Sequence, residues 1–406
     1  MKTSDEKRVK ANDYRTVVIG GDVRPTGRYE SLFARGEADQ IFGHLVPEFR
    51  LADYSIVNLE CPLVSIASPI TKTGKNFRAS AECLSGIVNA GIRAVNLANN
   101  HIMDQGETGL RSTLVACRLR SIDCVGAGSN LEQASRLLVS SLGTIRVAFL
   151  GLAEREFSSA GRRSPGFNPF DLMTVYKIMR LAREEYDYLI VLYHGGTEYY
   201  PYPSPRLQSA CRLLIELGAN AVICQHSHCP GCYEWYRGYP IVYGQGNLIT
   251  DGPAGGNPER YKGFLVKLKL APPPGRSVTM ERVNYVQSVG QLGVRRMNSA
   301  QETTFERELH ERSRTAADPE AIENEWRRHC DNKCPEYLSR LFGYGRVLSA
   351  INRRTRFKQK TLRAGRLAVL LNLVRCESHN EALVSILETL LAEKASEAKD
   401  RRADGL

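Results

Sequence analysis

The chain has 406 residues, of which 42% are hydrophobic and 24% are charged, and its formal net charge is +11. This composition is typical of a globular protein, and the length allows one large domain and a smaller one. The positive charge favours an anionic partner, such as a phosphate, an acidic polymer, nucleic acid or anionic lipid, without choosing among them.

The first residues and the cysteines indicate the compartment. Residues 1–15 are charged and polar and lack the apolar segment of a signal peptide. The longest apolar run, residues 367–371, is too short to span a bilayer. The eleven cysteines are scattered irregularly, as cytosolic thiols are, and Cys229 and Cys232 are expected to be plain thiols. We therefore expect a cytoplasmic protein without a signal peptide or a membrane span.

Short apolar strands that end directly in polar side chains recur along the first half of the chain. The strand predicted at 16–19 is followed by Gly20-Gly21-Asp22, and the strand at 54–57 is followed by Asn58-Leu59-Glu60. Parallel strands place such carboxylates at the edge of a sheet where α/β proteins build sites. The alternative for Asp22 is a helix cap, but the repetition at Glu60 favours a site.

Three later strands continue this pattern with amide and imidazole groups. The strand at 92–97 leads to Asn100 and His101, and Asp104 is expected to cap the helix that follows. The strand at 188–193 ends at His194, with Glu198 four residues on. The strand at 221–224 enters a loop with His226 and His228. A tight loop can turn both imidazoles toward one centre, whereas the alternative is two solvated histidines.

Helices are predicted between these strands, and the pattern changes after Cys224. The predicted helices are 41–49, 81–90, 112–119, 131–138, 172–185 and 207–217, and further strands are 123–125, 145–150 and 241–243. Residues 261–270 and 277–285 read as strands with no helix between them, which suggests an antiparallel pair closing an α/β core. From about Ala300 the chain is helical and charged. We predict a polar tail at 1–14, an α/β domain at 15–295 and a helical, basic region at 296–406.

The polar strand ends together offer a metal site. The candidate side chains are Asp22, Glu60, Asn100, His101, His194, Glu198, His226 and His228. Mixed carboxylate, amide and imidazole ligands suit Mn, Fe or Zn. Two metals about 3.5–4 Å apart need a bridging acid and two or three ligands each, which this set can supply. The chain has neither a phosphate-loop motif nor a motif for a serine or cysteine nucleophile.

Six motifs in order resemble those of the CapA family, the poly-γ-glutamate capsule biosynthesis proteins. They are Gly21-Asp22, Asn58-Leu59-Glu60, Ala98-Asn99-Asn100-His101, His194-Gly195-Gly196-Thr197-Glu198, Gln225-His226-Ser227-His228 and Tyr243-Gly244-Gln245-Gly246-Asn247. The resemblance covers about residues 15–252 and implies the calcineurin-like metallophosphoesterase fold, a four-layer α/β/β/α sandwich, here with a C-terminal helical extension.

The resemblance also implies roles for single residues. Asp22 and His228 would hold one divalent metal ion. Asn100, His194 and His226 would hold a second, and Glu60 would bridge the two. His101 would be the general acid or the oxyanion contact. The implied protein is a metal-dependent hydrolase of capsule or exopolymer biosynthesis, and the alternative is a non-catalytic accessory subunit that binds an anionic polymer or a membrane-bound synthase.

The chain departs from the family pattern at four positions. Arg24 stands where metallophosphoesterases have a histidine, Glu60 replaces their bridging aspartate, Gly195 replaces a tryptophan and Gln225 replaces a glycine. Losing the histidine removes one metal ligand, so a site with one metal ion, or with none, remains an alternative to a site with two. Arg24 could pair with a substrate carboxylate or phosphate, and with Glu198 it joins His101 among the candidate catalytic residues.

The C-terminal region has a basic stretch at 337–376, with ten Lys and Arg residues and no acid. One interpretation is a solvated helical face. The other is contact with an anionic polymer or with the inner membrane face near a polymer synthase, because an apolar run lies inside the stretch. Nucleic acid is not expected, since no recognised binding motif occurs.

Overall fold

The structure is a computed structural model, and it describes residues 13–252, 257–287 and 292–403. The chain divides into two compact units, Met1–Trp326 and Arg327–Leu406. Most of the predicted tail at 1–14 lies outside the described residues. The helical region predicted from residue 296 begins with α9 (Ser299–Ala317), which belongs to the first unit.

The first unit contains two large sheets, and the first sheet holds the N-terminal strands. Its strand order is β16-β15-β14-β1-β2-β3-β4, with β13 also paired to β1. The strands are β1 (Arg15–Val23), β2 (Tyr54–Leu59), β3 (Ala94–Asn96), β4 (Asp123–Val125), β13 (Asn247–Ile249), β14 (Lys262–Leu270), β15 (Val278–Gln287) and β16 (Val294–Arg295). β1 to β4 are parallel, and β14 and β15 form the antiparallel pair expected from the sequence.

The second sheet has the strand order β11-β12-β10-β9-β7-β6. Its strands are β6 (Leu138–Leu142), β7 (Ile145–Ala153), β9 (Tyr188–His194), β10 (Ala221–Gln225), β11 (Tyr233–Tyr236) and β12 (Tyr239–Val242). β7, β9, β10 and β12 are parallel, whereas β6 and β11 are antiparallel to their neighbours. A separate two-stranded sheet joins β5 (Ala127–Gly128) to β8 (Gly166–Phe167).

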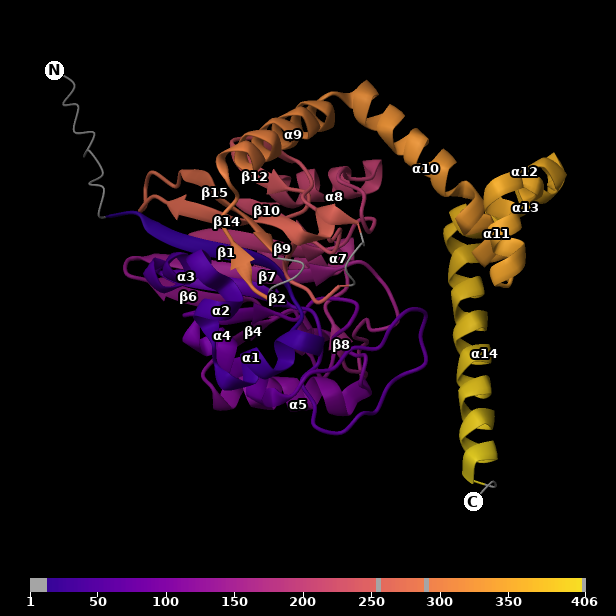
Figure 1. The fold of residues 1–406 in the computed structure, drawn as a ribbon, viewed down its shortest axis with the longest axis horizontal. Coiled ribbons are helices and arrows are strands. Elements are labelled where there is room, and N and C mark those ends of the chain that lie inside the picture. The colour runs from indigo at the N-terminus through magenta and orange to yellow at the C-terminus, as the bar shows by residue number, and fades with distance from the viewer. Residues whose placement is uncertain (1–12, 253–256, 288–291, 404–406) are drawn as a thin grey trace. The chain divides into compact units, whose positions relative to one another are not determined.

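Alternating side chains along the strands produce a four-layer sandwich. Val17 and Ile19 of β1 pack with Phe149 and Ile190 of the second sheet, whereas Val18 packs with the helices of the first sheet. Successive residues of a strand face opposite sides, so a strand buried on both faces is apolar throughout. The layer order is therefore α/β/β/α, and the fold class predicted from the sequence is confirmed (Figure 1).

The helices form the outer layers. On the first sheet they are α1 (Glu30–Arg35), α2 (Ala38–Phe42), α3 (Val46–Leu51), α4 (Leu84–Asn89) and α5 (Gly106–Leu119). On the second sheet they are α7 (Leu172–Leu181) and α8 (Pro205–Glu216). Short 3₁₀ turns are η2 (Gly27–Tyr29), η3 (Gly43–Leu45), η4 (Ala81–Cys83) and η5 (Pro258–Tyr261).

Two helix predictions are wrong in part. The predicted helix 41–49 is interrupted after Phe42, because Gly43 takes a φ of +51° and no continuous helix passes through it. The predicted helix 131–138 is only the short α6 (Leu131–Ala134), and the chain enters β6 at Leu138. β6 and β7 form a hairpin whose turn contains Gly143 at φ +62°, so tertiary strand pairing overrides the local helical spacing.

The second unit is helical and has a small polar core. α10 (Pro319–Leu341) enters it, and α11 (Arg346–Thr355), α12 (Phe357–Thr361), α13 (Ala364–Arg375) and α14 (Glu377–Ala403) follow. The buried Asn352 donates Nδ2 hydrogen bonds to the carbonyl oxygen of Pro335 and to Oγ of Ser339. Within the described ranges, no helix has both the length and the apolar character needed to cross a membrane.

Candidate metal centre

The candidate site lies where the carboxyl ends of strands from both sheets meet. β1 and β2 of the first sheet bring Asp22 and Glu60, while β9 and the loop after β10 bring the histidines. β1 pairs with β13 so closely that a Cβ on Gly21 would lie 2.2 Å from the carbonyl oxygen of Gly246. Only glycine fits there, and this close contact fixes the end of β1 that carries Asp22.

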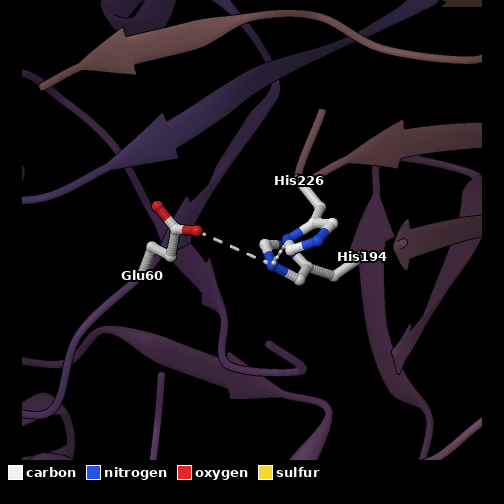
Figure 2. Close-up of side chains that lie close together, drawn as sticks. All are labelled: Glu60, His194 and His226. Carbon is white, nitrogen blue, oxygen red and sulfur yellow. Dashed lines mark hydrogen bonds and ion pairs between the residues drawn. The ribbon is translucent and has the colours of Figure 1, made fainter. Parts of the chain in front are cut away.

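One group of ligand atoms is formed by Glu60, His194 and His226, whose candidate ligand atoms all lie within 4.8 Å of one another. Nε2 of His194 lies 3.1 Å from Nδ1 of His226 and 3.7 Å from Oε1 of Glu60. Figure 2 shows the two imidazoles facing the Glu60 carboxylate across the space between the sheets. Oδ1 of Asn100 lies 3.1 Å from Nε2 of His194 and completes the group.

A second group shares Glu60 and adds Asp22 and His228. Nδ1 of His228 lies 3.2 Å from Oδ2 of Asp22, and Nε2 of the same ring lies 3.6 Å from Oε1 of Glu60. All three side chains are buried. The six residues predicted as metal ligands are thus brought together as two groups that have one carboxylate in common.

The loop after β10 has a strained backbone, and this conformation directs both of its histidines toward the centre. His226 has φ +95° and His228 has φ +54°, in the region that residues with a side chain rarely occupy. The backbone N–H of His226 donates a hydrogen bond to Oδ2 of Asp22 at 3.2 Å. In an extended segment these two imidazoles would point to opposite sides, so the loop conformation is what makes them neighbours.

Burial and neighbouring charges set the protonation of the cluster. Burial by itself would raise the pKa of Asp22, but His228, His194 and Asn58 outweigh it and hold that pKa below its usual range. Burial, followed by the adjacent His226, lowers the pKa of His194 well below its ordinary value. Burial also lowers the pKa of His226. Neutral imidazoles and an ionised carboxylate are the forms that bind a cation.

The pKa values of Glu60 and His228 are raised, in contrast to the lowered values of the groups described above. Burial raises the pKa of Glu60, and the nearby Asp22 adds to this. Burial opposes protonation of His228, but attraction to Glu60 and Asp22 prevails and raises its pKa. Without a cation, the centre therefore favours a proton on these groups.

His101 lies beside the two groups and is held by Asp104. Nδ1 of His101 lies 2.7 Å from Oδ2 of Asp104, and its ring packs 4.5 Å from the ring of Phe77. Asp104 also accepts the backbone N–H of Phe77 at 2.6 Å and pairs with Lys72. The prediction that Asp104 caps a helix is wrong, because its carboxylate is fully buried in these contacts and α5 begins after Gln105 without a side-chain cap.

The other two candidate catalytic residues are placed differently. Arg24 is buried, with Nε 3.5 Å from Oε2 of Glu60 and its guanidinium 4.8 Å from the Phe77 ring centre. Glu198 is exposed in the turn after β9, and no hydrogen bond or ion pair between described residues joins it to the cluster. The structure therefore brings Arg24 into the site and leaves Glu198 at its surface.

Sequence reasoning missed a layer of amides and a lysine around the ligands. Asn58 donates Nδ2 to Oδ1 of Asp22 at 2.7 Å, and Asn99 donates Nδ2 to Oδ1 of Asn58 at 3.1 Å. Gln225 donates Nε2 to the carbonyl oxygen of Gly20 and so ties the two sheets together. The asparagines stand inside the recognised motifs and could have been found there. Lys72 lies in an irregular loop and carries no such signal.

The residues present fit a divalent cation. Among the described side chains, both oxygens of Glu60 are buried without a hydrogen-bond partner. Buried polar atoms without a partner are costly. A cation would satisfy both oxygens, and the mixture of carboxylate, amide and imidazole suits Mn, Fe or Zn.

The fold and the site define a class, a four-layer α/β/β/α protein with a buried His and carboxylate cluster at the strand ends. Residues 16–252 match the family described as bacterial capsule synthesis protein PGA_cap, and the chain belongs to this family. The resemblance to CapA proteins predicted from six motifs is confirmed, and all of the candidate site residues lie inside the matched range.

Three curated relatives illustrate the similarity. "Capsule biosynthesis protein CapA" of Bacillus anthracis is 29% identical over 251 residues, which are 60% of this chain and 61% of the relative. "PGA biosynthesis protein CapA" of Bacillus subtilis (strain 168) is 28% identical over 247 residues, 59% of this chain and 64% of the relative. A "probable polyglutamine synthesis accessory protein" of Mycobacterium tuberculosis is 28% identical over 252 residues, which are 58% of this chain and 66% of the relative. The matches to the two Bacillus proteins span less than two thirds of those proteins.

Among solved structures, a hypothetical protein from Thermus thermophilus has a TM-score of 0.42 and 18% identity, covering 67% of this chain and 100% of that chain. Vps29 from Chaetomium thermophilum has a TM-score of 0.19 and 15% identity, covering 48% of this chain and 82% of that one. These TM-scores are too low to support a conclusion.

Proposed function

We propose that this protein is a metal-dependent hydrolase of capsule or exopolymer biosynthesis that acts on a phosphoester or on an acidic polymer. The observation that carries the proposal is the sharing of buried Glu60 by two three-residue groups of ligand type. A bridging carboxylate between two ligand sets is what a pair of catalytic metals requires. The printed names of the curated relatives support the biosynthetic role.

The two groups assign the ligands. Asp22, His228 and Glu60 would hold one cation. His194, His226 and Asn100, with Glu60 again, would hold the other. When bound, such ions would polarise an oxygen of the substrate and lower the pKa of a water molecule.

In this proposal His101 is the residue that moves a proton. Oδ2 of Asp104 lies 2.7 Å from its Nδ1, and a carboxylate can only accept there, so this contact favours the tautomer with the proton on Nδ1. Nε2 then remains for the reacting group, as a donor when the ring is protonated and as an acceptor when it is neutral. Phe77 packs on the ring and limits its rotation.

Positive groups at the site suit an anionic substrate. Arg24 stands 3.5 Å from Glu60, and Arg260 lies 5.9 Å from the ring centre of Tyr199. That ring lies 6.0 Å from the ring of His228. A phosphate or a carboxylate that reached the ligand groups would thus meet one or both guanidinium groups.

The test uses the full chain, freed of metal with a chelator and then reloaded with Mn²⁺. Hydrolysis of bis(p-nitrophenyl) phosphate and shortening of poly-γ-glutamate are both measured. We expect activity on at least one substrate with Mn²⁺, and none after chelation or in His226→Ala. Full metal occupancy without hydrolysis of either substrate would contradict the hydrolase.

One observation favours the second candidate, a non-catalytic accessory subunit. The cationic Arg24 sits beside the Glu60 carboxylate and offsets part of the charge that would attract a metal. The printed name of the Mycobacterium tuberculosis relative also describes an accessory protein. Polymer binding by a protein that takes up no metal would support this candidate over the hydrolase.

A further inference from the structure

The second unit exposes a dense group of positive side chains. Of the ten Lys and Arg residues at 337–376, nine are exposed and only Lys358 is half-buried. Within the described part of the chain, Arg340 is the one of the ten with a salt-bridge partner, Glu336. No salt bridge between described residues pairs the other nine, and the stretch itself contains no acid.

Apolar side chains lie among these charges on two helices. Leu367, Leu371 and Val374 follow the i, i+4, i+7 spacing of one face of α13 and are 44%, 51% and 62% exposed. On α11, Val347 and Ile351 share a face and are 73% and 45% exposed. Grouped exposed apolar residues mark an interaction surface more often than single ones do.

The exposure does not result from a missing core, because the unit is packed by other residues. Asn352 is buried and bonded to the α10 backbone, and Tyr344 stacks on Phe357 with ring centres 5.7 Å apart. Nζ of Lys358 lies 3.9 Å from the ring centre of Phe342. The apolar residues on the outer faces of α11 and α13 take no part in these contacts.

We propose that helices α11 to α13 dock on an anionic lipid bilayer. The exposed Arg and Lys side chains would contact lipid phosphates, and Leu367, Leu371 and Val374 would enter the boundary between headgroups and acyl chains. A helix with an apolar face between basic residues binds a membrane in this way. The surface belongs to the second unit and shares no residue with the candidate metal centre, so the proposal stands whether or not that centre is catalytic.

Charge argues against two other occupants. A second copy of the chain joined through this surface would bring the same unneutralised positive charges together, which like-charge repulsion opposes. A nucleic acid would satisfy the charges but would leave the apolar face of α13 uncovered. An anionic bilayer satisfies both features at once.

The experiment is sedimentation of the full chain with vesicles at low and high salt. One set of vesicles contains phosphatidylglycerol and phosphatidylethanolamine, and the other contains phosphatidylcholine alone. The charge variant is Arg353→Glu, Arg354→Glu, Arg363→Glu. The apolar variant is Leu367→Gln, Leu371→Gln, Val374→Gln. The control reverses the same number of charges on exposed residues of the first unit, Arg111→Glu, Arg118→Glu, Arg162→Glu.

We expect binding to the anionic vesicles only, weakened by salt because exposed charges are screened. Each basic residue near an anionic surface adds to the affinity for the membrane. The charge variant, which reverses three of them, should therefore bind the anionic vesicles at least about 100-fold more weakly than wild type. The apolar variant should bind more weakly than wild type, and the control should change far less than the charge variant.

Three results would overturn the proposal: equal binding to neutral vesicles, an equal loss in the control and charge variants, or no vesicle binding together with a dimer that the apolar variant dissociates in light scattering. Far-UV circular dichroism checks that every variant keeps its helices, and all substituted side chains are exposed.

Discussion

Oε1 of Glu60 lies 3.6 Å from Nε2 of His228, and no described donor makes a hydrogen bond to either oxygen of this buried carboxylate. A desolvated carboxylate without donors is unfavourable in the metal-free protein. Its neighbours, three histidines and an aspartate within ligand distance, indicate that the centre is arranged for a cation at the expense of metal-free stability.

Replacing Glu60 by glutamine should stabilise the metal-free protein and abolish its stabilisation by metal. The raised pKa of Glu60 already includes attraction to Arg24, so the site as a whole disfavours the charge. We expect a gain of roughly 1–3 kcal/mol without metal. Thermal unfolding with chelator and with Mn²⁺ measures both effects, and a variant less stable than wild type in chelator would contradict the argument.

The same substitution predicts a dependence on pH. The pKa of Glu60 is raised above its ordinary value of 4.5 in the folded chain, so the folded state holds the proton to higher pH than the unfolded chain does. The cost of ionisation is absent below that ordinary value and develops as pH rises through the raised pKa. In chelator, the stability difference between Glu60→Gln and wild type should therefore be small in acid and grow toward neutral pH.

His226→Ala and His228→Ala should each lower the amount of bound metal, because each removes one imidazole from one of the two groups. Elemental analysis of protein reloaded with Mn²⁺ measures the loss. His310→Ala is the matched control, since His310 is exposed on α9 away from both groups. Full occupancy in both site variants would refute the ligand assignment.

His101→Ala should keep the metal and lose hydrolytic rate, by about 10²–10⁴-fold in kcat for a general acid. Asp104→Asn should lower the rate less and alter its pH profile, because Asp104 acts by fixing the His101 ring. Metal content and kcat are measured together on the same samples. A normal kcat in His101→Ala would exclude the proton-transfer role.

Gly21→Ala should destabilise the protein and lower its metal content together. A Cβ at this position would lie 2.2 Å from the carbonyl oxygen of Gly246, so β1 and β13 would have to separate next to Asp22. We expect a loss of roughly 2–4 kcal/mol by urea unfolding, as for other overpacked sites. Gly275→Ala is the control, because its nearest neighbour would lie at 3.6 Å.

The sequence by itself determined which apolar runs form the central strands and which ligand types stand at their ends. Apolar runs such as 16–19 and 188–193 read as buried strands because both faces of a sandwiched strand must be apolar. Asp22, Glu60 and His194 follow those runs directly, so their place at a sheet edge required only local pattern. The family was also readable, since six short motifs survive in order.

Only the tertiary structure decided which of these side chains meet. The pairing of β1 with β2 and of β9 with β10 sets which strand ends are neighbours. The positive φ of His226 then turns its ring toward His194, and no residue pattern encodes that dihedral. Local pattern likewise predicts a helix cap at Asp104, because the contacts that bury its carboxylate are not visible in the sequence. Its role depends on contacts with His101 and Lys72, and the Lys72 contact joins segments distant in the chain. Local preference places a side chain on an element, whereas long-range packing places that element beside another.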